Sequence, residues 1–137
     1  MGLILDTSVV IAGERQNHTV RQILEQFKAQ YGETEIALSV VTIVELTHGV
    51  ERAKPDDRRI RRQAFVDELI RDMPVYPLTV ETAKLAGRIE GQQAQHGLNI
   101  SFEDLLIAAT ALERNFGVVT GNVRHFRRIT GLTVIPA

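Results

Sequence analysis

Hydrophobic positions follow two alternating patterns along the chain: short unbroken apolar runs, and longer stretches with apolar residues at three- and four-residue intervals. Residues 2–5 form an apolar run that ends at Asp6 and predicts a buried strand leading into a helix. Helical spacing over 18–30 predicts an amphipathic helix. The same patterns predict further strands at 36–38, 75–76, 118–120 and 132–135, and helices at 56–72, 79–96 and 102–115, with a short one after Asn122. They also predict a helix that ends near Arg52, for which Ser39 and Thr42 are both candidate caps.

Short apolar strands that alternate with helices predict an α/β fold: a short central parallel sheet flanked by helices on both faces. No internal repeat or linker divides the sequence, so we expect a single domain over 1–137. In an open parallel sheet, ligands bind beyond the carboxyl ends of the strands. We therefore expect Asp6 and the segment 120–122 to emerge at the functional site.

The amino-acid composition excludes several kinds of functional site. The 137 residues contain no cysteine, which excludes disulfides, thiolate zinc sites and cysteine nucleophiles. Hydrophobic residues make up 44% and charged residues 24% of the chain, which is typical of a globular protein. No apolar run is long enough to span a bilayer, and the N-terminal residues do not resemble a signal peptide. We expect a cytoplasmic protein with no membrane contact.

Positive charge is clustered although the net charge is only −1. One cluster lies between Arg52 and Arg62, and another contains Arg124, His125, Arg127 and Arg128. Such patches can contact phosphate groups even when acids elsewhere balance the total charge. Each patch taken alone is also consistent with a solvated helix face.

Three acids lie in apolar surroundings: Asp6, Glu45 and Asp104. Asp6 follows the first strand, where aspartate is also a good N-cap. Glu45 lies within an apolar run, where a buried carboxylate requires a cation, a hydrogen-bond partner or access to water, although a surface position on a narrow polar stripe is an alternative. Asp104 starts a strongly apolar helix three positions after Ser101, a spacing also expected for a capping box. Glu103 is its natural competitor.

The three acids together indicate a site for a hard divalent cation. Magnesium takes oxygen ligands and retains several waters, so a few convergent carboxylates suffice. Four scattered histidines and no cysteine make zinc a poorer match. The corresponding chemistry is metal-assisted hydrolysis, in which the metal activates water and stabilises charge on a phosphoryl oxygen.

Four segments in order resemble the successive motifs of the PIN domain, and the length and order resemble the VapC toxins. They are Leu3-Ile-Leu-Asp-Thr-Ser8, Val44-Glu45-Leu, Asp104-Leu-Leu-Ile-Ala-Ala-Thr-Ala111 and Val119-Thr-Gly-Asn-Val-Arg-His-Phe126. The resemblance covers essentially the whole chain. It implies a PIN fold and a magnesium- or manganese-dependent endoribonuclease with an RNA substrate. It also implies a homodimer and a VapB-type antitoxin, with which the toxin forms a larger hetero-oligomer.

By position, the resemblance makes Asp6, Glu45 and Asp104 the metal-binding and catalytic acids. It assigns supporting roles to a hydroxyl of Thr7 or Ser8, which would hold Asp6, and to Thr120 beside the site.

The sequence departs from the family pattern in its last motif, where many PIN domains have a fourth acid. The corresponding positions hold Asn122 and His125. Asn122 can ligate through its carbonyl oxygen, and His125 can contact phosphate or take part in proton transfer. We expect one firmly bound ion, with a second recruited together with RNA phosphate, and we expect Arg124 and Arg127 to contact the substrate.

Two other classes of function remain open from the sequence. One is a PIN-like domain that binds RNA or a protein without catalysis, and the other is a metal-dependent phosphatase or flap-type DNA nuclease. We also expect the helical region 42–72 to hold the antitoxin dock, using Val50, Ile60, Phe65 and Leu69, unless these residues fill the protein's own core.

Overall fold

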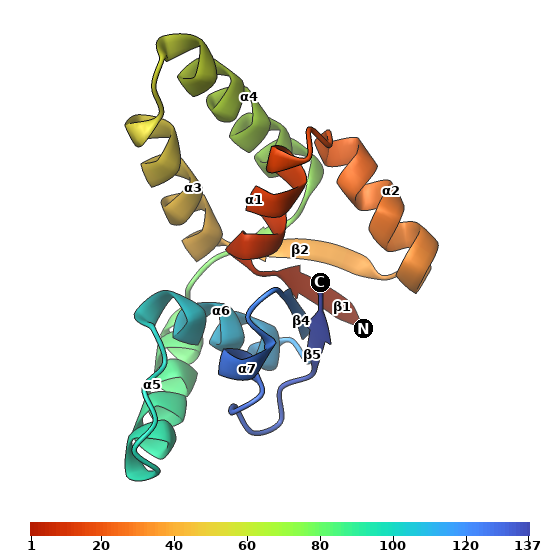
Figure 1. The fold of residues 1–137 in the computed structure, drawn as a ribbon. Coiled ribbons are helices and arrows are strands. Elements are labelled where there is room, and N and C mark those ends of the chain that lie inside the picture. Colours follow the sequence, from red (N-terminus) through yellow and green to blue (C-terminus); the bar gives the residue numbers. More distant parts are fainter.

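Five short strands form one parallel sheet at the centre of the molecule (Figure 1). The computed structural model describes all residues from Met1 to Ala137. The strands are β1 (Gly2–Leu5), β2 (Glu35–Ser39), β3 (Val75–Tyr76), β4 (Gly117–Thr120) and β5 (Val134–Pro136). The helices are α1 (Thr7–Arg15), α2 (Val20–Tyr31), α3 (Val40–Arg52), α4 (Asp56–Asp72), α5 (Val80–Gln95), α6 (Phe102–Glu113) and α7 (Val123–Phe126). The predicted alternation of strands and helices is confirmed.

The strand order is β3-β2-β1-β4-β5, and every pair is parallel. The chain moves from β1 outward to β2 and β3 on one side, then returns to place β4 and β5 on the other. The direction of winding therefore changes between β1 and β4, and the carboxyl ends of these two strands flank the switch point. Sheets of this kind bind ligands at such a point.

Side chains alternate between the two faces of the sheet, and each face carries its own apolar core. Leu3, Leu5 and Leu38 pack with residues of α1, α2 and α4. Ile4, Ala37 and Val118 pack with residues of α5, α6 and α7. Figure 1 shows these two helical layers on opposite sides of the sheet. Both sheet faces are covered, as the apolar strands predict.

Helix α6 is the most deeply packed helix. Ile107, Ala108, Ala109 and Ala111 are fully buried, and Leu105 is nearly so. Small alanine side chains let this helix lie close to the sheet on one side and to α5 on the other. This burial confirms the prediction of a central apolar helix and fixes the direction of the first turn, which carries Asp104.

Hydroxyl side chains set the starts of four helices. Thr19 and Thr79 form reciprocal capping boxes, whereas Ser39 and Ser101 each accept one backbone N–H. Of the two candidate caps, Ser39 is the one that caps α3, so this helix starts at Val40. Thr42 thus lies inside the helix and is fully buried rather than acting as a cap.

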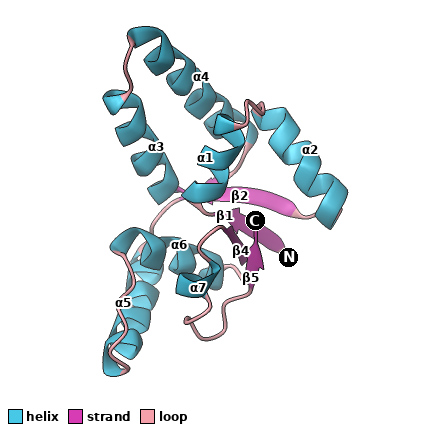
Figure 2. Cartoon of the chain, in the orientation of Figure 1, coloured by secondary structure: helices cyan, strands magenta, loops and turns pink.

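The helical hairpin of α3 and α4 extends away from the sheet (Figure 2). Val50 and Leu69, expected at an antitoxin dock, are 2% and 0% exposed and belong to the protein's own interior. Phe65 also packs partly against the core, which leaves Ile60 as the one exposed member of the expected set. That expectation was wrong for the buried residues because both helices turn these positions inward. No helix has the length and apolar character needed to cross a membrane.

Candidate active site

Asp6 is held in place at the carboxyl end of β1. Its backbone N–H donates to the Val119 carbonyl at 2.9 Å, and the residue is 3% exposed. One side-chain oxygen, Oδ2, accepts hydrogen bonds from the hydroxyls of Ser8 and Thr120, each at 2.8 Å. The other oxygen, Oδ1, accepts none from the protein. The side chain makes no N-cap bond to α1, so the capping explanation for this aspartate is wrong.

Ser8 connects three parts of the site. Its hydroxyl donates to Asp6 and accepts the Gly121 backbone N–H at 3.3 Å. Thr120 similarly accepts the Asn122 N–H at 2.8 Å while it donates to Asp6. These bonds tie the first turn of α1 to the turn after β4. At the switch point of the sheet, these bonds therefore hold Asp6 Oδ2 in a fixed orientation.

Glu45 reaches the site from α3. The Thr7 hydroxyl donates to Glu45 Oε1 at 2.6 Å and lies 3.0 Å from the Thr42 hydroxyl. Thr7 and Thr42 are buried, whereas Glu45 is half-buried. Thus Ser8 supports Asp6, and Thr7 supports Glu45 instead. The role of Thr42 was missed, because a threonine inside an apolar helical run gives no sequence signal beyond a possible cap.

Asp104 lies in the first turn of α6, after the Ser101 cap. Its side chain is 16% exposed, and Oδ2 is 3.9 Å from Nδ1 of His125. The neighbouring Glu103 is exposed. Of the two adjacent acids, Asp104 is therefore the one held near the switch point.

The acids influence one another electrostatically. Burial raises the pKa of the Glu45 carboxyl, the Thr7 hydrogen bond lowers it, and the negative charges of Asp6, Glu103 and Asp104 raise it further. Burial also raises the pKa of Asp104, as do the charges of Asp6 and Glu103, while Ser101 and His125 act in the opposite direction. The three predicted acids come from three distant segments, yet their charges are near enough to raise the pKa of Glu45 and Asp104.

The side chains of Asp6, Glu45 and Asp104 fit one kind of cation better than another. No three histidine, cysteine, aspartate or glutamate side chains are close enough together to enclose a metal ion. A closed zinc-type cage is thus absent. Magnesium, by contrast, keeps much of its water and uses one or two carboxylates. The three acids offer oxygen ligands, and Asp6 Oδ1 has no protein partner. A cation would also offset the repulsion between the acids, so these residues fit a hydrated hard cation.

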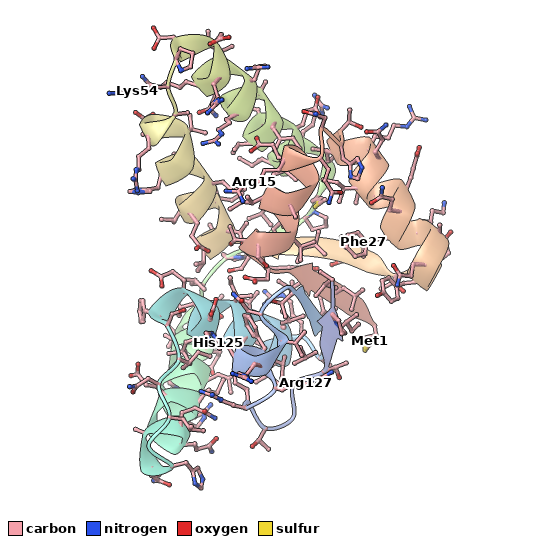
Figure 3. The ribbon with its side chains drawn as sticks, viewed as in Figure 1. Met1, Arg15, Phe27, Lys54, His125 and Arg127 are labelled. Carbon is pink, nitrogen blue, oxygen red and sulfur yellow. The ribbon has the colours of Figure 1, made fainter.

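The remaining predicted residues lie on and around α7. Asn122 is the N-cap residue of α7 and is exposed, without a side-chain cap bond. His125, with a 56% exposed side chain, stands beside Asp104. Arg124 and Arg127 are exposed and have no carboxylate partner within ion-pair distance. Figure 3 labels His125 and Arg127 on the same part of the molecule.

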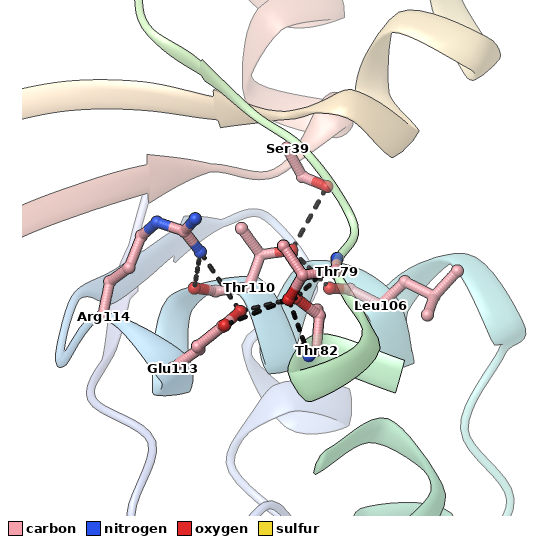
Figure 4. Close-up of polar contacts among 7 residues, drawn as sticks. All are labelled: Ser39, Thr79, Thr82, Leu106, Thr110, Glu113 and Arg114. Carbon is pink, nitrogen blue, oxygen red and sulfur yellow. Dashed lines mark hydrogen bonds and ion pairs between the residues drawn. The ribbon is translucent and has the colours of Figure 1, made fainter. Parts of the chain in front are cut away.

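A second polar cluster holds α6 against α5 and β2 (Figure 4). Glu113 accepts hydrogen bonds from Thr82 at 2.5 Å and Thr79 at 3.3 Å. Near the same end of α6, Thr110 donates to the Leu106 carbonyl at 2.8 Å and contacts the Ser39 hydroxyl at 3.4 Å. These contacts are structural, since they fix the helix whose first turn presents Asp104.

A parallel sheet covered on both faces, with three acids near its switch point, is the arrangement expected of a PIN domain. The family model for the PIN domain matches residues 3–132.

Comparison with known proteins shows to which group of PIN domains the chain is similar. The chain is 34% identical over 135 residues to the ribonuclease VapC1 of Rickettsia felis, covering 98% of this chain and 96% of that protein. It is 27% identical to the tRNA(fMet)-specific endonuclease VapC of Shigella flexneri, covering 94% and 92%. The crystal structure of DNA-bound VapBC from Salmonella typhimurium aligns with a TM-score of 0.84 at 27% identity, covering 99% and 98%. The chain belongs to the PIN-domain family and, within it, to the VapC group.

Proposed function

We propose that the chain is a magnesium-dependent endoribonuclease that serves as the toxin of a type II toxin–antitoxin pair. The single observation that carries this proposal is the state of Asp6. It is almost fully buried, one of its oxygens is fixed by Ser8 and Thr120, and the other has no protein partner. A carboxylate oriented in this way beside two further acids is suited to hold a cation at the point where a parallel sheet receives its ligand.

Asp6, Glu45 and Asp104 are the residues proposed to hold the ion, with Mg²⁺ or Mn²⁺ as the candidates. When bound, the cation supplies an activated water and offsets negative charge that develops on the phosphoryl oxygens. Ser8 and Thr120 orient Asp6, and Thr7 orients Glu45. These fixed bonds reduce the reorganisation needed when the substrate arrives.

The residues of α7 are proposed to act on the substrate. His125 is exposed beside Asp104, where its ring can donate to a phosphate oxygen or carry a proton. Arg124 and Arg127 offer unpaired guanidinium groups to the RNA backbone. Since Asn122 and His125 replace the fourth acid, we propose one firmly held ion and a second that arrives with RNA phosphate.

The proposed partners follow from the relatives. The Salmonella typhimurium neighbour is a VapBC complex, and we propose that a VapB-type antitoxin binds and inhibits this chain. We also propose a homodimer that forms a larger hetero-oligomer with the antitoxin. RNA is the proposed substrate class. A small antitoxin-like gene directly upstream would support the toxin assignment, and its absence would favour a domain without a toxin role.

Cleavage-site mapping on total RNA tests the proposed function. The wild type should produce discrete new 5′ ends in the presence of magnesium, whereas Asp6→Asn and Asp104→Asn should produce none. Glu103→Gln is the matched control, because it removes an adjacent but exposed acid. Expression of the wild type should arrest growth, and both aspartate variants should relieve the arrest. Normal cleavage by both aspartate variants contradicts the site assignment.

The missing fourth carboxylate supports a second candidate, a PIN-like domain that binds RNA or a protein without cutting RNA. This candidate predicts that the wild type binds RNA and leaves every phosphodiester bond intact, with either Mg²⁺ or Mn²⁺. The mapping experiment thus separates the two functions.

A further inference from the structure

An arginine-rich groove of about 400 Å³ lies between the end of α1 and the first half of α4. Its lining is polar except for one partly buried aromatic side chain, Phe65. Four arginines and one glutamate line it, which gives the groove an excess of three positive charges. The lining residues are Glu14, Arg15, Asn17, His18, Arg58, Arg61, Arg62 and Phe65.

Two of the four arginines have no carboxylate partner. Arg62 lies 3.8 Å from Glu14 and also donates to the Gly49 carbonyl. Arg61 lies 3.9 Å from Asp57, with both side chains well exposed. By contrast, Arg15 and Arg58 form no ion pair within 4.0 Å and are exposed. Their guanidinium groups are free to bind an anion.

A second depression shares Arg15 with this groove and extends toward the acidic site as far as Ser8. It follows the exposed face of α1 and is lined by Ser8, Ile11, Ala12, Arg15 and Gln16. Ser8 at one end donates to Asp6, and Arg15 at the other end also lines the arginine groove. Figure 3 labels Arg15 on α1, near the helical hairpin of α3 and α4. Arg15 lies seven positions after Ser8 in the helix, which is a rise of about 10 Å.

We propose that this surface, the α1 track formed by Ser8, Ala12, Arg15 and Arg58, binds the sugar–phosphate backbone of single-stranded RNA. The inference rests on the proposed ribonuclease function. It assigns the groove to phosphates a few nucleotides away from the bond cleaved at Asp6. Arginine is suited to this task because its planar guanidinium binds phosphate through two hydrogen bonds. Phe65 adds an aromatic surface of the type on which bases stack.

RNA explains this surface better than a protein partner does. A protein interface usually has apolar or aromatic anchors at its centre. The groove has a single such side chain, and it shares Arg15 with the depression that reaches Ser8, the residue that donates to Asp6. Binding of an acidic segment of a partner protein is the competing outcome of the test.

The test measures RNA binding without cleavage, in the Asp6→Asn background. Two probes are used, a 20-nucleotide and a 4-nucleotide single-stranded RNA of randomised sequence, and fluorescence anisotropy is recorded between 50 and 200 mM salt. The test variant carries Arg15→Gln and Arg58→Gln. The matched control carries Arg21→Gln and Arg88→Gln, two exposed arginines on α2 and α5. All variants should have the same thermal unfolding midpoint, because every changed side chain is exposed.

Loss of two phosphate contacts should reduce the slope of log affinity against log salt by about 1.4 for the long RNA. At 50 mM salt its binding should weaken by about tenfold. The short RNA and the control variant should show the wild-type slope. An unchanged slope for the long RNA in the test variant overturns the α1 track. So does a selective loss of binding to a co-expressed antitoxin, since that result assigns the groove to an acidic protein.

Failure of this inference is distinguishable from failure of the proposed function. If the wild type cleaves RNA with magnesium but the slope does not change, the ribonuclease stands and the α1 track is wrong. If the slope falls but no cleavage occurs, the track binds RNA on a protein that does not cut it.

Discussion

Thr7→Val removes a single hydroxyl from the most tightly connected part of the site. The Thr7 hydroxyl donates to Glu45 Oε1 at 2.6 Å and lies 3.0 Å from the buried Thr42 hydroxyl. Valine keeps the branched shape of threonine, so packing at the start of α1 is largely retained. The substitution leaves Glu45 without its orienting bond and Thr42 without its hydroxyl partner.

The size of the effect follows from these two contacts. A hydrogen bond to a charged group contributes about 1.5–3 kcal/mol, and an unsatisfied buried hydroxyl costs about 1–3 kcal/mol. Because the two effects share one side chain, they do not add fully, and we expect a loss of about 2–3 kcal/mol in the free energy of unfolding. For a domain of this size that loss lowers the unfolding midpoint by about 7–10 °C.

Calorimetry of the metal-free protein at pH 7 measures this change, with Thr7→Ser as the control that retains the hydroxyl. The double variant Thr7→Val with Thr42→Val should recover part of the lost stability, because it removes the orphaned hydroxyl. The Thr7 hydrogen bond lowers the pKa of Glu45, so its loss should move the acid limb of the cleavage profile to higher pH. A Thr7→Val midpoint within about 2 °C of the wild type refutes the reasoning.

Three further predictions concern charge and packing. The folded protein raises the pKa of Asp104, so ionisation destabilises the fold as pH rises through that pKa. Asp104→Asn should therefore raise the unfolding midpoint of the metal-free protein at pH 7. This gain should shrink as the pH falls toward the range where the wild-type carboxyl is protonated. Equal midpoints for variant and wild type at pH 7 contradict this prediction. Added Mg²⁺ should raise the wild-type midpoint but leave Asp6→Asn nearly unchanged, as followed by thermal melts in chelator and in excess magnesium. Ala109→Leu should cost about 1–3 kcal/mol in urea unfolding because the fully buried α6 has no room for a larger side chain, and wild-type stability would show that the helix is less tightly packed.

The fold could be predicted closely from the sequence because the short apolar runs of the strands and the three- and four-residue spacing of the helices fall in different segments of the chain. Even the two-residue strand β3 could be located, since Val75 and Tyr76 lie between two prolines. The start of α3 stayed open between two residues, because Ser39 and Thr42 are both good caps and only tertiary packing shows that Thr42 is buried.

The acids of the site were also predictable, since each interrupts an apolar segment. Their supporting contacts were not. Thr7 and Ser8 are adjacent and chemically similar, and only the path of α3 decides that Thr7 serves Glu45 while Ser8 serves Asp6. The groove beside Arg15 was equally hidden, because it joins residues of α1 and α4 that lie more than forty positions apart.

The most direct test of the central claim is a magnesium titration of RNA cleavage by the wild type and Asp104→Asn. The account predicts no wild-type cleavage in chelator, full recovery with Mg²⁺ or Mn²⁺, and no recovery of the variant at the same ion concentrations. Cleavage by the wild type in chelator would contradict the account. So would a variant with the same rate and the same magnesium dependence as the wild type.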